Sequence, residues 1–191
     1  MRHFVYFSKN ATTSGNFGDL MKAGRMDIAI HSFIQGVFLS HDFRKDVKFH
    51  FVFYGMPDPP KHIEIQVTDK LEISKKDIGN LIKKILYKYR QGEKTEVFPE
   101  CFVEKKSLLK VIEELIESGS EIFLLDGKGE DIRDAKIPDN SVFILGDHDG
   151  IPSKELKRLK KIATSVSVGP KTYFASQVVA VVNNELDRRR I

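Results

Sequence analysis

Short apolar runs alternate with longer segments of helical periodicity from one end of the chain to the other. The runs are rich in Val, Ile and Phe, as buried strands are, and the predicted strands are residues 3–7, 47–54, 62–67, 121–125, 141–145 and 164–168. The predicted helices are residues 25–41, 75–89, 105–118, 153–162 and 172–190. This alternation predicts an α/β fold, with a mostly parallel sheet and helices on both of its faces.

The pattern shows no boundary between domains. The Gly- and Pro-rich turn at residues 55–60 is too short to link two domains, and the sequence has no internal repeat or low-complexity segment. With 191 residues, the chain is at the upper end of the usual range for one domain. We therefore expect a single domain that spans residues 1–191.

Two predicted helices are apolar around most of their circumference. The C-terminal one carries an apolar stripe from Ala175 to Leu186, while Ala180 and Val181 add apolar surface outside that stripe, and residues 27–39 are similar. A helix of this kind must be buried on more than one side. A domain of this size has few places to do so twice, so we expect at least one of the two in a subunit interface. Deep burial within one subunit is the alternative.

Charge and cysteine content narrow the environment of the protein. The net charge of +4 and the pI near 9.0 permit a nucleic-acid partner without requiring one. Basic clusters recur on predicted helices, at residues 75–76, 83–84, 105–106, 157–158, 160–161 and 188–190. Each alone is typical of a solvated helix face, whereas together they favour a polyanionic partner. Cys101 is the single cysteine, which fits a reducing cytoplasm, and we expect neither a membrane span nor a signal peptide.

Glycines follow three successive predicted strands, in the loops at residues 126–131, 146–152 and 169–173. In parallel α/β sheets, ligands bind beyond the carboxyl ends of the strands, and glycine lets a ligand approach the backbone closely. A tight turn alone explains one such loop, but three in succession favour a ligand pocket. The glycine fingerprints of dinucleotide-binding and P-loop proteins are absent from the sequence.

The run Asp147-His148-Asp149 raises the question of a metal ion. Adjacent loop residues rarely converge on one ion, and the other histidines do not have the sequence spacing of metal ligands. We therefore expect no metal site, and we interpret His148 as a turn residue or as a group that forms a hydrogen bond within the loop.

Two segments near the C-terminus resemble a known family. The segment LGDHDGIP, residues 145–152, followed by SVGPKTYFASQ, residues 167–177, resembles the signature of the SPOUT methyltransferases. More closely, it resembles the archaeal tRNA (pseudouridine-54) N1-methyltransferase family. Residues 18–20, 24–27, 40–47 and 182–188 are similar to that family in the same order, so the resemblance covers nearly the whole chain.

The resemblance implies a fold and a cofactor that the pattern alone does not reach. SPOUT enzymes thread their C-terminal segment into a trefoil knot, here expected at about residues 120–191, and bind S-adenosylmethionine against the glycine loops. They form homodimers through the knot helices, and this family acts on tRNA. The implied cofactor-binding residues are Leu124, Leu125, Asp126, Gly127, Leu145, Gly146, Asp147, Gly150, Ser167, Val168, Gly169, Pro170, Tyr173, Phe174, Ser176 and Val178. Val178 stands where relatives often have a cysteine, which implies an apolar contact with the cofactor.

The implied reaction is methyl transfer to N1 of pseudouridine 54 in tRNA. Because the sugar of pseudouridine is attached through carbon, N1 keeps a proton that must leave near the moment of attack. A carboxylate can accept that proton, or a cation can stabilise the anion. The candidates in the N-terminal half are Asp19, Arg25, Asp27, Arg44 and Asp46, of which Asp19 and Arg25 are favoured because they lie in a glycine-punctuated loop. Each is also explained as a helix cap, an ion-pair partner or a phosphate contact.

Two other functions are compatible with the same motifs. One is a SPOUT enzyme that methylates rRNA or another RNA atom, and the other is a non-catalytic RNA-binding protein that retains the knot. Methyl incorporation into tRNA with pseudouridine, compared with unmodified tRNA and rRNA, separates the three.

Overall fold

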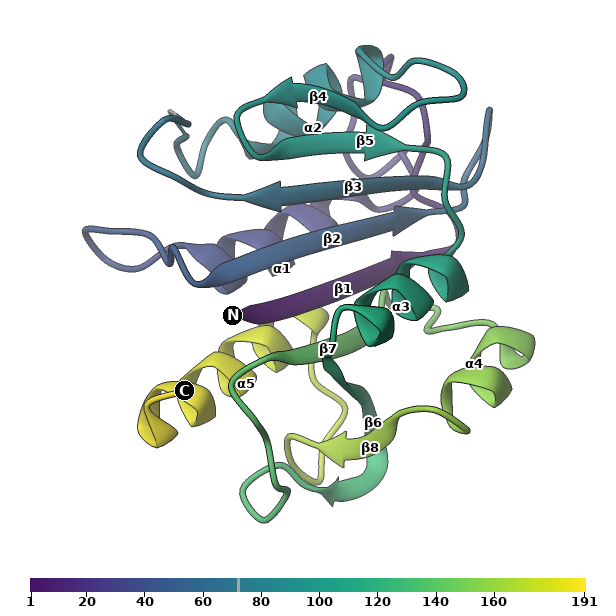
Figure 1. Cartoon of the computed structure of the whole chain (residues 1–191). Coiled ribbons are helices and arrows are strands. Elements are labelled where there is room, and N and C mark those ends of the chain that lie inside the picture. Colours follow the sequence, from purple (N-terminus) through teal and green to yellow (C-terminus); the bar gives the residue numbers. More distant parts are fainter. Residues whose placement is uncertain (72) are drawn as a thin grey trace.

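The computed structural model describes residues 1–71 and 73–191, which form an eight-stranded sheet in the order β4-β5-β3-β2-β1-β7-β6-β8 (Figure 1). The strands are β1 (Arg2–Ser8), β2 (Val47–Phe53), β3 (Lys61–Gln66), β4 (Thr95–Phe98), β5 (Cys101–Glu104), β6 (Glu121–Asp131), β7 (Ser141–Gly146) and β8 (Thr164–Ser167). The helices are α1 (Met26–Val37), α2 (Ile78–Tyr87), α3 (Leu108–Glu117), α4 (Ser153–Leu159) and α5 (Ala175–Arg189). Strands β2, β1, β7, β6 and β8 run parallel, whereas β3, β5 and β4 pair antiparallel at one edge.

Every predicted strand and helix is present, with its ends shifted by a few residues. The pattern missed β4 and β5, because each is only four residues long and is not uniformly apolar. The predicted loop at residues 126–131 is wrong in part, since β6 continues to Asp131 and shifts its register with β8 between Leu125 and Glu130. A Cβ on Gly129 would lie 2.5 Å from the backbone of Ser165, so glycine is needed where these strands meet.

Helices cover both faces of the sheet, as expected (Figure 1). Helices α1, α2 and α5 bury Phe33, Ile82 and Val182 against one face, while α3 and α4 bury Ile112 and Leu159 against the other. Helices α1 and α5 also pack against each other, so each is buried on two sides, which accounts for much of their apolar circumference. No helix in the described residues is both long and apolar enough to cross a bilayer.

A buried arginine fastens the end of α5 to the first strand. The guanidinium of Arg2 donates to Asn183 Oδ1 (3.2 Å) and forms an ion pair with Asp187 (2.8 Å). Its Nη2 and Nε also donate to the carbonyl oxygen of Ile191 (2.7 and 3.1 Å). The amide of Asn183 donates in turn to the Gly36 carbonyl of α1 (3.0 Å). These bonds hold α5 against both α1 and β1, and they satisfy polar groups that are buried between them.

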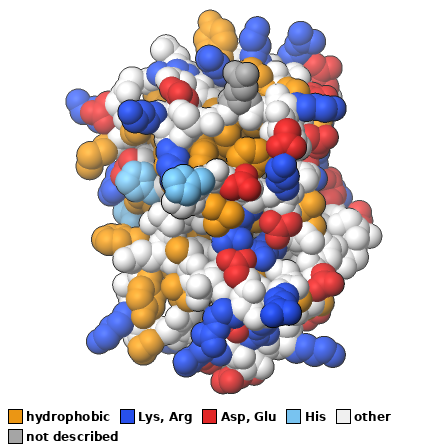
Figure 2. Space-filling model, turned by 90° about the vertical axis from the view of Figure 1, so that its left-hand side faces the viewer, with side chains coloured by type: hydrophobic (Ala, Val, Ile, Leu, Met, Phe, Trp, Pro, Cys, Tyr) orange, Lys and Arg blue, Asp and Glu red, His pale blue; other side chains and the backbone are white. Residues whose placement is uncertain are grey.

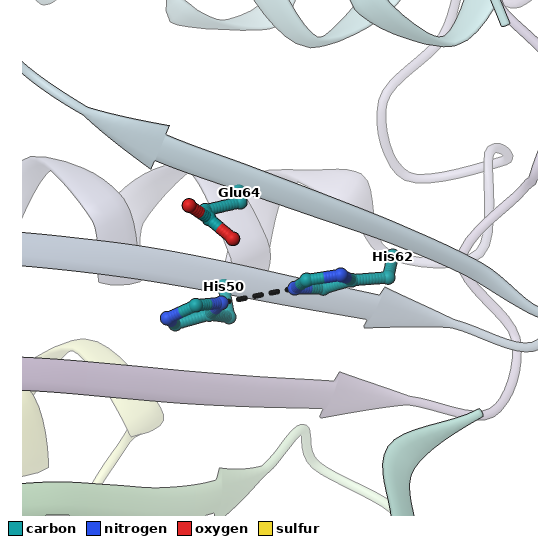
Figure 3. A group of neighbouring side chains, drawn as sticks. All are labelled: His50, His62 and Glu64. Carbon is teal, nitrogen blue, oxygen red and sulfur yellow. Dashed lines mark hydrogen bonds between the residues drawn. The ribbon is translucent and has the colours of Figure 1, made fainter. Parts of the chain in front are cut away.

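Three histidines form a hydrogen-bonded row across β1, β2 and β3, and the row ends on β5. His3 Nδ1 lies 3.1 Å from His50 Nε2, and His50 Nδ1 lies 2.9 Å from His62 Nε2 (Figure 3). His62 Nδ1 lies 3.0 Å from Glu104 Oε1. The planes of neighbouring rings differ by 17° and 9°, and the ring centroids are 5.4 and 5.2 Å apart. Each centroid separation is about the nitrogen–nitrogen distance plus the distances from the two nitrogens to the centres of their own rings. Each bond therefore lies in the ring planes and nearly on one line.

This alignment identifies the contacts as hydrogen bonds rather than as a metal site. Glu64 lies beside His50 and His62, with one ligand atom of each residue within 4.8 Å of the others (Figure 3). If a zinc ion lay on the line between two ligand nitrogens, those nitrogens would be about 4 Å apart. His50 Nδ1 and His62 Nε2 are only 2.9 Å apart. The carboxylate of Glu64 instead pairs with Lys48 (3.1 Å) and Lys94 (3.0 Å).

The carboxylate of Glu104 sets the direction of the row. Burial raises its pKa, but hydrogen bonds from His62 and Lys106 outweigh burial and lower the pKa to about 2. Glu104 is therefore an acceptor, and His62 must donate from Nδ1. His62 then accepts at Nε2 from His50, which accepts at Nε2 from His3. In this arrangement Nδ1 is the donor and Nε2 the acceptor of each bond between the rings.

We expect the free energy of unfolding to fall as the pH is lowered from about 6.5 to about 4. Burial, assisted by the charge of Lys48, lowers the pKa of His3 from 6.5 to about 4, and burial lowers that of His50 well below 6.5. The unfolded chain therefore binds protons in this interval that the folded chain excludes. For His3 alone the loss is about 3 kcal/mol. Urea denaturation at a series of pH values measures it.

The exposed His41 offers a matched control. His3→Gln should flatten the loss of stability between pH 6.5 and 4, whereas His41→Gln should leave it unchanged. Nitrogen-15 NMR of the imidazoles should show protonated Nδ1 atoms in His3, His50 and His62. Protonated Nε2 atoms instead, or identical pH profiles for the two variants, would contradict the assigned row.

Candidate active site

A cavity of about 760 Å³ lies beside residues 124–128 of β6, where β7 and β8 end and α5 begins. Most of the residues expected to bind the cofactor line it: Leu124, Leu125, Asp126, Gly127, Leu145, Gly146, Asp147, Gly150, Ser167, Val168, Gly169, Tyr173, Phe174 and Val178. Pro170 and Ser176 are outside this lining. Pro170 is exposed in its turn, and Ser176 is about 200° of helical rotation from Val178 on α5.

The cavity wall also includes residues that the sequence reasoning did not select: Ile28, Lys128, His148, Ile151, Leu156, Lys160, Val166, Lys171, Thr172, Ala175 and Gln177. Most of them are next to the glycine loops in sequence, so a wider reading of those loops finds them. Leu156 and Lys160, from α4 and its C-terminal end, and Ile28, from α1, are the exceptions, because only the packing of these helices brings them to the wall. Apolar walls with a few polar groups are typical of small-molecule sites.

The loop glycines serve the packing of the protein as well as the cavity. A Cβ on Gly146 would lie 2.7 Å from the carbonyl carbon of Gly150, and one on Gly169 would lie 2.9 Å from the Tyr173 hydroxyl. The expectation that Gly146 serves to admit a cofactor is therefore incomplete, because its own loop already requires glycine there. A Cβ on Gly127 would meet no atom within 4 Å, so this position faces open space.

An ion pair holds the first loop against the end of α4. Lys160 lies 2.6 Å from Asp126 Oδ2, and the N–H of Lys128 donates to Asp126 Oδ1 (3.0 Å). These hydrogen bonds lower the pKa of Asp126. The carboxylate is thus charged and oriented at the cavity wall.

The predicted catalytic residues divide into two groups, and the first group lies at or before the start of α1, whose Ile28 lines the cavity. Arg25 has a left-handed backbone (φ 62°) just before α1, and its guanidinium bonds both carboxylate oxygens of Asp27 (3.0 and 3.0 Å). The next residue, Ile28, lines the cavity. The hydrogen bond from Arg25 lowers the pKa of Asp27. Asp19 is exposed in the preceding loop, where its Oδ1 accepts from the N–H of Met21 (2.9 Å).

Arg44 and Asp46 form the second group, which lies at the amino ends of β1 and β2. Asp46 directly precedes β2 and pairs with Arg2 at the amino end of β1 (3.2 Å). Arg44 binds both oxygens of Asp187 near the end of α5 (2.7 and 2.6 Å). Both residues help to fasten α5 to the sheet, and neither is among the residues that line the cavity. Although Arg44 and Asp46 are close to Arg25 in the sequence, they are not close to it in the structure.

Tyr6 is a residue of this region that the sequence reasoning missed. Its side chain is fully buried, it pairs in register with Leu145, and its hydroxyl has no hydrogen-bond partner among the described residues. Burial and the charges of Asp147 and Asp27 raise its pKa, so the phenol stays protonated. Buried donors are nearly always paired. The only signal in the sequence was one polar aromatic within an apolar strand, which marks a core position equally well.

Comparisons with known proteins agree on one family. All of residues 1–191 match a family model described as putative SAM-dependent RNA methyltransferase. The tRNA (pseudouridine(54)-N(1))-methyltransferase of Methanococcoides burtonii is 36% identical over 98% of this chain and 96% of the relative. The enzyme of the same name from Methanocaldococcus jannaschii is 32% identical over 100% of this chain and 98% of the relative.

A solved structure shares the fold. Archaeoglobus fulgidus Nep1 bound to S-adenosylhomocysteine matches with a TM-score of 0.65, over 98% of this chain and 97% of that chain. The sequence identity is 15%, so this likeness concerns the fold alone.

Two glycine substitutions should separate packing from open space. Gly146→Ala should lower the free energy of unfolding by about 1–3 kcal/mol, because the new Cβ would meet the backbone of Gly150. Gly127→Ala should change it by less than about 0.5 kcal/mol. Chemical denaturation measures both values, and an equal loss in the two variants would contradict this reading of the loops.

Proposed function

The chain belongs to the family of putative SAM-dependent RNA methyltransferases, and we propose that it methylates N1 of pseudouridine 54 in tRNA. Relatives that carry this name match it over nearly the full length of both chains. The observation that carries the proposal is the cavity at the strand ends. All three glycine loops expected to bind S-adenosylmethionine line it, and so does Ile28, which follows the Arg25–Asp27 pair in the sequence.

The cavity fits the cofactor in size and chemistry. About 760 Å³ is within the range of ligand pockets. Leu124, Leu145 and Val166 offer apolar contacts for a planar base, and Asp126 offers a charged acceptor for polar groups. Gly127 leaves the backbone open to close approach. When bound, S-adenosylmethionine supplies an electrophilic methyl group, and these residues hold it in place.

The Arg25–Asp27 pair suits the acceptor side of the reaction. The base becomes anionic as N1 loses its proton, and a fixed guanidinium stabilises such a charge. Because the bond to Arg25 lowers the pKa of Asp27, that carboxylate is a weak base and mainly orients Arg25. Asp19 is on the same segment and is exposed, so we assign it as the proton acceptor. Arg44 and Asp46, at the far edge, are assigned to stability.

The surface favours tRNA binding at the carboxyl side of the sheet. Lys128 and Lys171 are exposed at the cavity wall, where they can contact phosphates. By contrast, Figure 2 shows the side of the molecule away from the carboxyl ends of β1 and β2, and there basic, acidic and apolar side chains are interspersed. A mixed surface of this kind gives little net attraction for a polyanion.

We further propose the finer architecture that the family resemblance implies. The chain is one domain, its region of about residues 120–191 holds the knot and the cofactor, and the protein works in the cytoplasm as a homodimer. The exposed apolar residues Phe174 (77%) and Val181 (36%) support an interface through α5. We propose no metal in catalysis, because Asp147 and Asp149 already accept hydrogen bonds from Ser8 and Asn10.

Arg25→Ala should lower the single-turnover rate of methyl transfer to pseudouridine-54 tRNA by about 100-fold or more. The affinity for S-adenosylhomocysteine should stay near the parent's, since Arg25 does not line the cavity. Transcripts with uridine 54 should not react, because their N1 carries the sugar. Radiolabelled methyl incorporation and calorimetry provide these measurements.

Arg133 offers a matched control, because it binds Asp131 through the same two-point contact (2.9 and 2.5 Å) and does not line the cavity. Arg133→Ala should keep the parent's rate. Full activity of Arg25→Ala would remove that residue from the reaction, and methylation of uridine 54 would overturn the N1 chemistry.

The parent should sediment as a dimer at micromolar concentration, and Val181→Glu should raise its dissociation constant about tenfold or more, because it places a charge in the apolar interface. Ile116→Glu is the control, since Ile116 is similarly exposed (40%) but lies on α3. A monomeric parent, or equal weakening by both variants, would rule out an interface through α5.

A further inference from the structure

The carboxylate of Asp147 is buried between the two halves of the proposed site. The Ser8 hydroxyl donates to its Oδ2 (2.6 Å), and the N–H of Asp149 donates to its Oδ1 (2.9 Å). The N–H of Asp147 itself donates to the Phe7 carbonyl (3.0 Å). With an exposed fraction of 8%, Asp147 directs both carboxylate oxygens at the protein rather than at solvent.

Two side-chain bonds join residues 8–11 to residues 147–149, which are distant in sequence. Besides the bond between Ser8 and Asp147, the amide of Asn10 donates to Asp149 Oδ2 (2.7 Å). The Ser8 hydroxyl also accepts from the Ala11 N–H (3.0 Å), so its orientation is fixed at both ends. We refer to these contacts of Ser8, Asn10, Asp147 and Asp149 as the clamp.

The clamp is connected to Arg25 through direct packing of the backbone. Residues 8–25 leave β1, make a loop and return, and the N–H of Thr12 donates to the Ala23 carbonyl (3.1 Å). A Cβ on Gly24 would lie 1.8 Å from the Asn10 carbonyl oxygen, so these two backbones are in tight contact. Any shift of Asn10 therefore displaces Gly24 and, with it, the adjacent Arg25.

Electrostatics place the same groups together. The charges of Asp147, Asp27 and Arg25 all act on the buried hydroxyl of Tyr6, and the charge of Asp147 also acts on Arg25. Asp147 of the clamp and the Arg25–Asp27 pair are thus all close enough to one buried phenol for their charges to act on it.

We propose that Asp147 and Ser8 are positioning residues, which set Arg25 and Asp19 against the cofactor loop. Their bond controls the rate of methyl transfer more than the affinity for cofactor. The inference rests on the proposed function for its kinetic readout. It also assigns Asp147 a different task from the cofactor contact that the family resemblance implied.

Ser8→Ala tests the clamp, because it removes the donor to Asp147 and leaves the carboxylate in place. We expect the single-turnover rate on pseudouridine-54 tRNA to fall about 10- to 100-fold, while the dissociation constant for S-adenosylhomocysteine changes less than about threefold. Ser8→Thr, which keeps the hydroxyl, should restore the rate. Ser141→Ala is the matched control. Ser141 is also buried, and its hydroxyl donates to the Pro138 carbonyl, but it lies at the amino end of β7, away from the clamp.

An unchanged rate in Ser8→Ala would overturn the proposal. So would a loss of cofactor affinity as large as the loss of rate, since Asp147 would then belong to the cofactor site. If Ser8→Ala does not fold, Asn10→Ala removes the exposed bond to Asp149 and carries the same expectations.

A readout without tRNA keeps this test separate from the proposed function. In the parent, S-adenosylhomocysteine should slow amide hydrogen exchange in residues 8–25, and in Ser8→Ala that protection should be lost. If the parent does not methylate tRNA but shows this protection, the proposed function fails and the clamp stands. Protection that persists in Ser8→Ala would refute the clamp whatever the substrate.

Discussion

The parallel pairing of β7 with both β1 and β6 is the constraint on which the rest of the site depends. It aligns Phe7 with Gly146, so the carboxyl ends of β1 and β7 lie next to each other. Residues 8–25, which lead to the Arg25–Asp27 pair, and the loop of residues 146–152 therefore start side by side. With β8 added beside β6, all three glycine loops converge on one cavity. A shift of this register by one residue would turn every side chain of β7 to the other face.

Buried polar networks secure the parts of the fold that this pairing does not reach. Arg2 and Asn183 hold α5 to β1 and α1 at the amino edge, and the histidine row joins β1, β2 and β3 to Glu104 of β5. In both, each buried polar group has a partner, which is what makes such networks tolerable in a protein interior. They differ in their response to pH, because the guanidinium is charged throughout whereas burial lowers the pKa of His3 and His50 and keeps these two imidazoles neutral.

The proposed active site divides its work between rigid and adjustable parts. At Gly146 the loop packs closely, because a Cβ there would meet the backbone of Gly150. The acceptor side is held less directly: Arg25 is oriented by Asp27 and located by the packing of Gly24 on Asn10. Such an arrangement lets one loop contact set the distance between reacting groups, which is where small displacements have large effects on rate.

The amino-acid sequence by itself determined the α/β class, the main strands and helices, the glycine loops and the family, because periodicity and contiguous motifs are local properties of the chain. It did not reveal the β4–β5 hairpin, whose four-residue strands carry too short a pattern, nor the continuation of β6 beyond Leu125. Only the tertiary structure decided that Ile28 lines the cavity while Arg44 and Asp46 do not. It alone brought His3, His50 and His62 into one row, and Ser8 to Asp147. These contacts follow from strand register and helix packing, and both are set by pairings between segments far apart in the sequence.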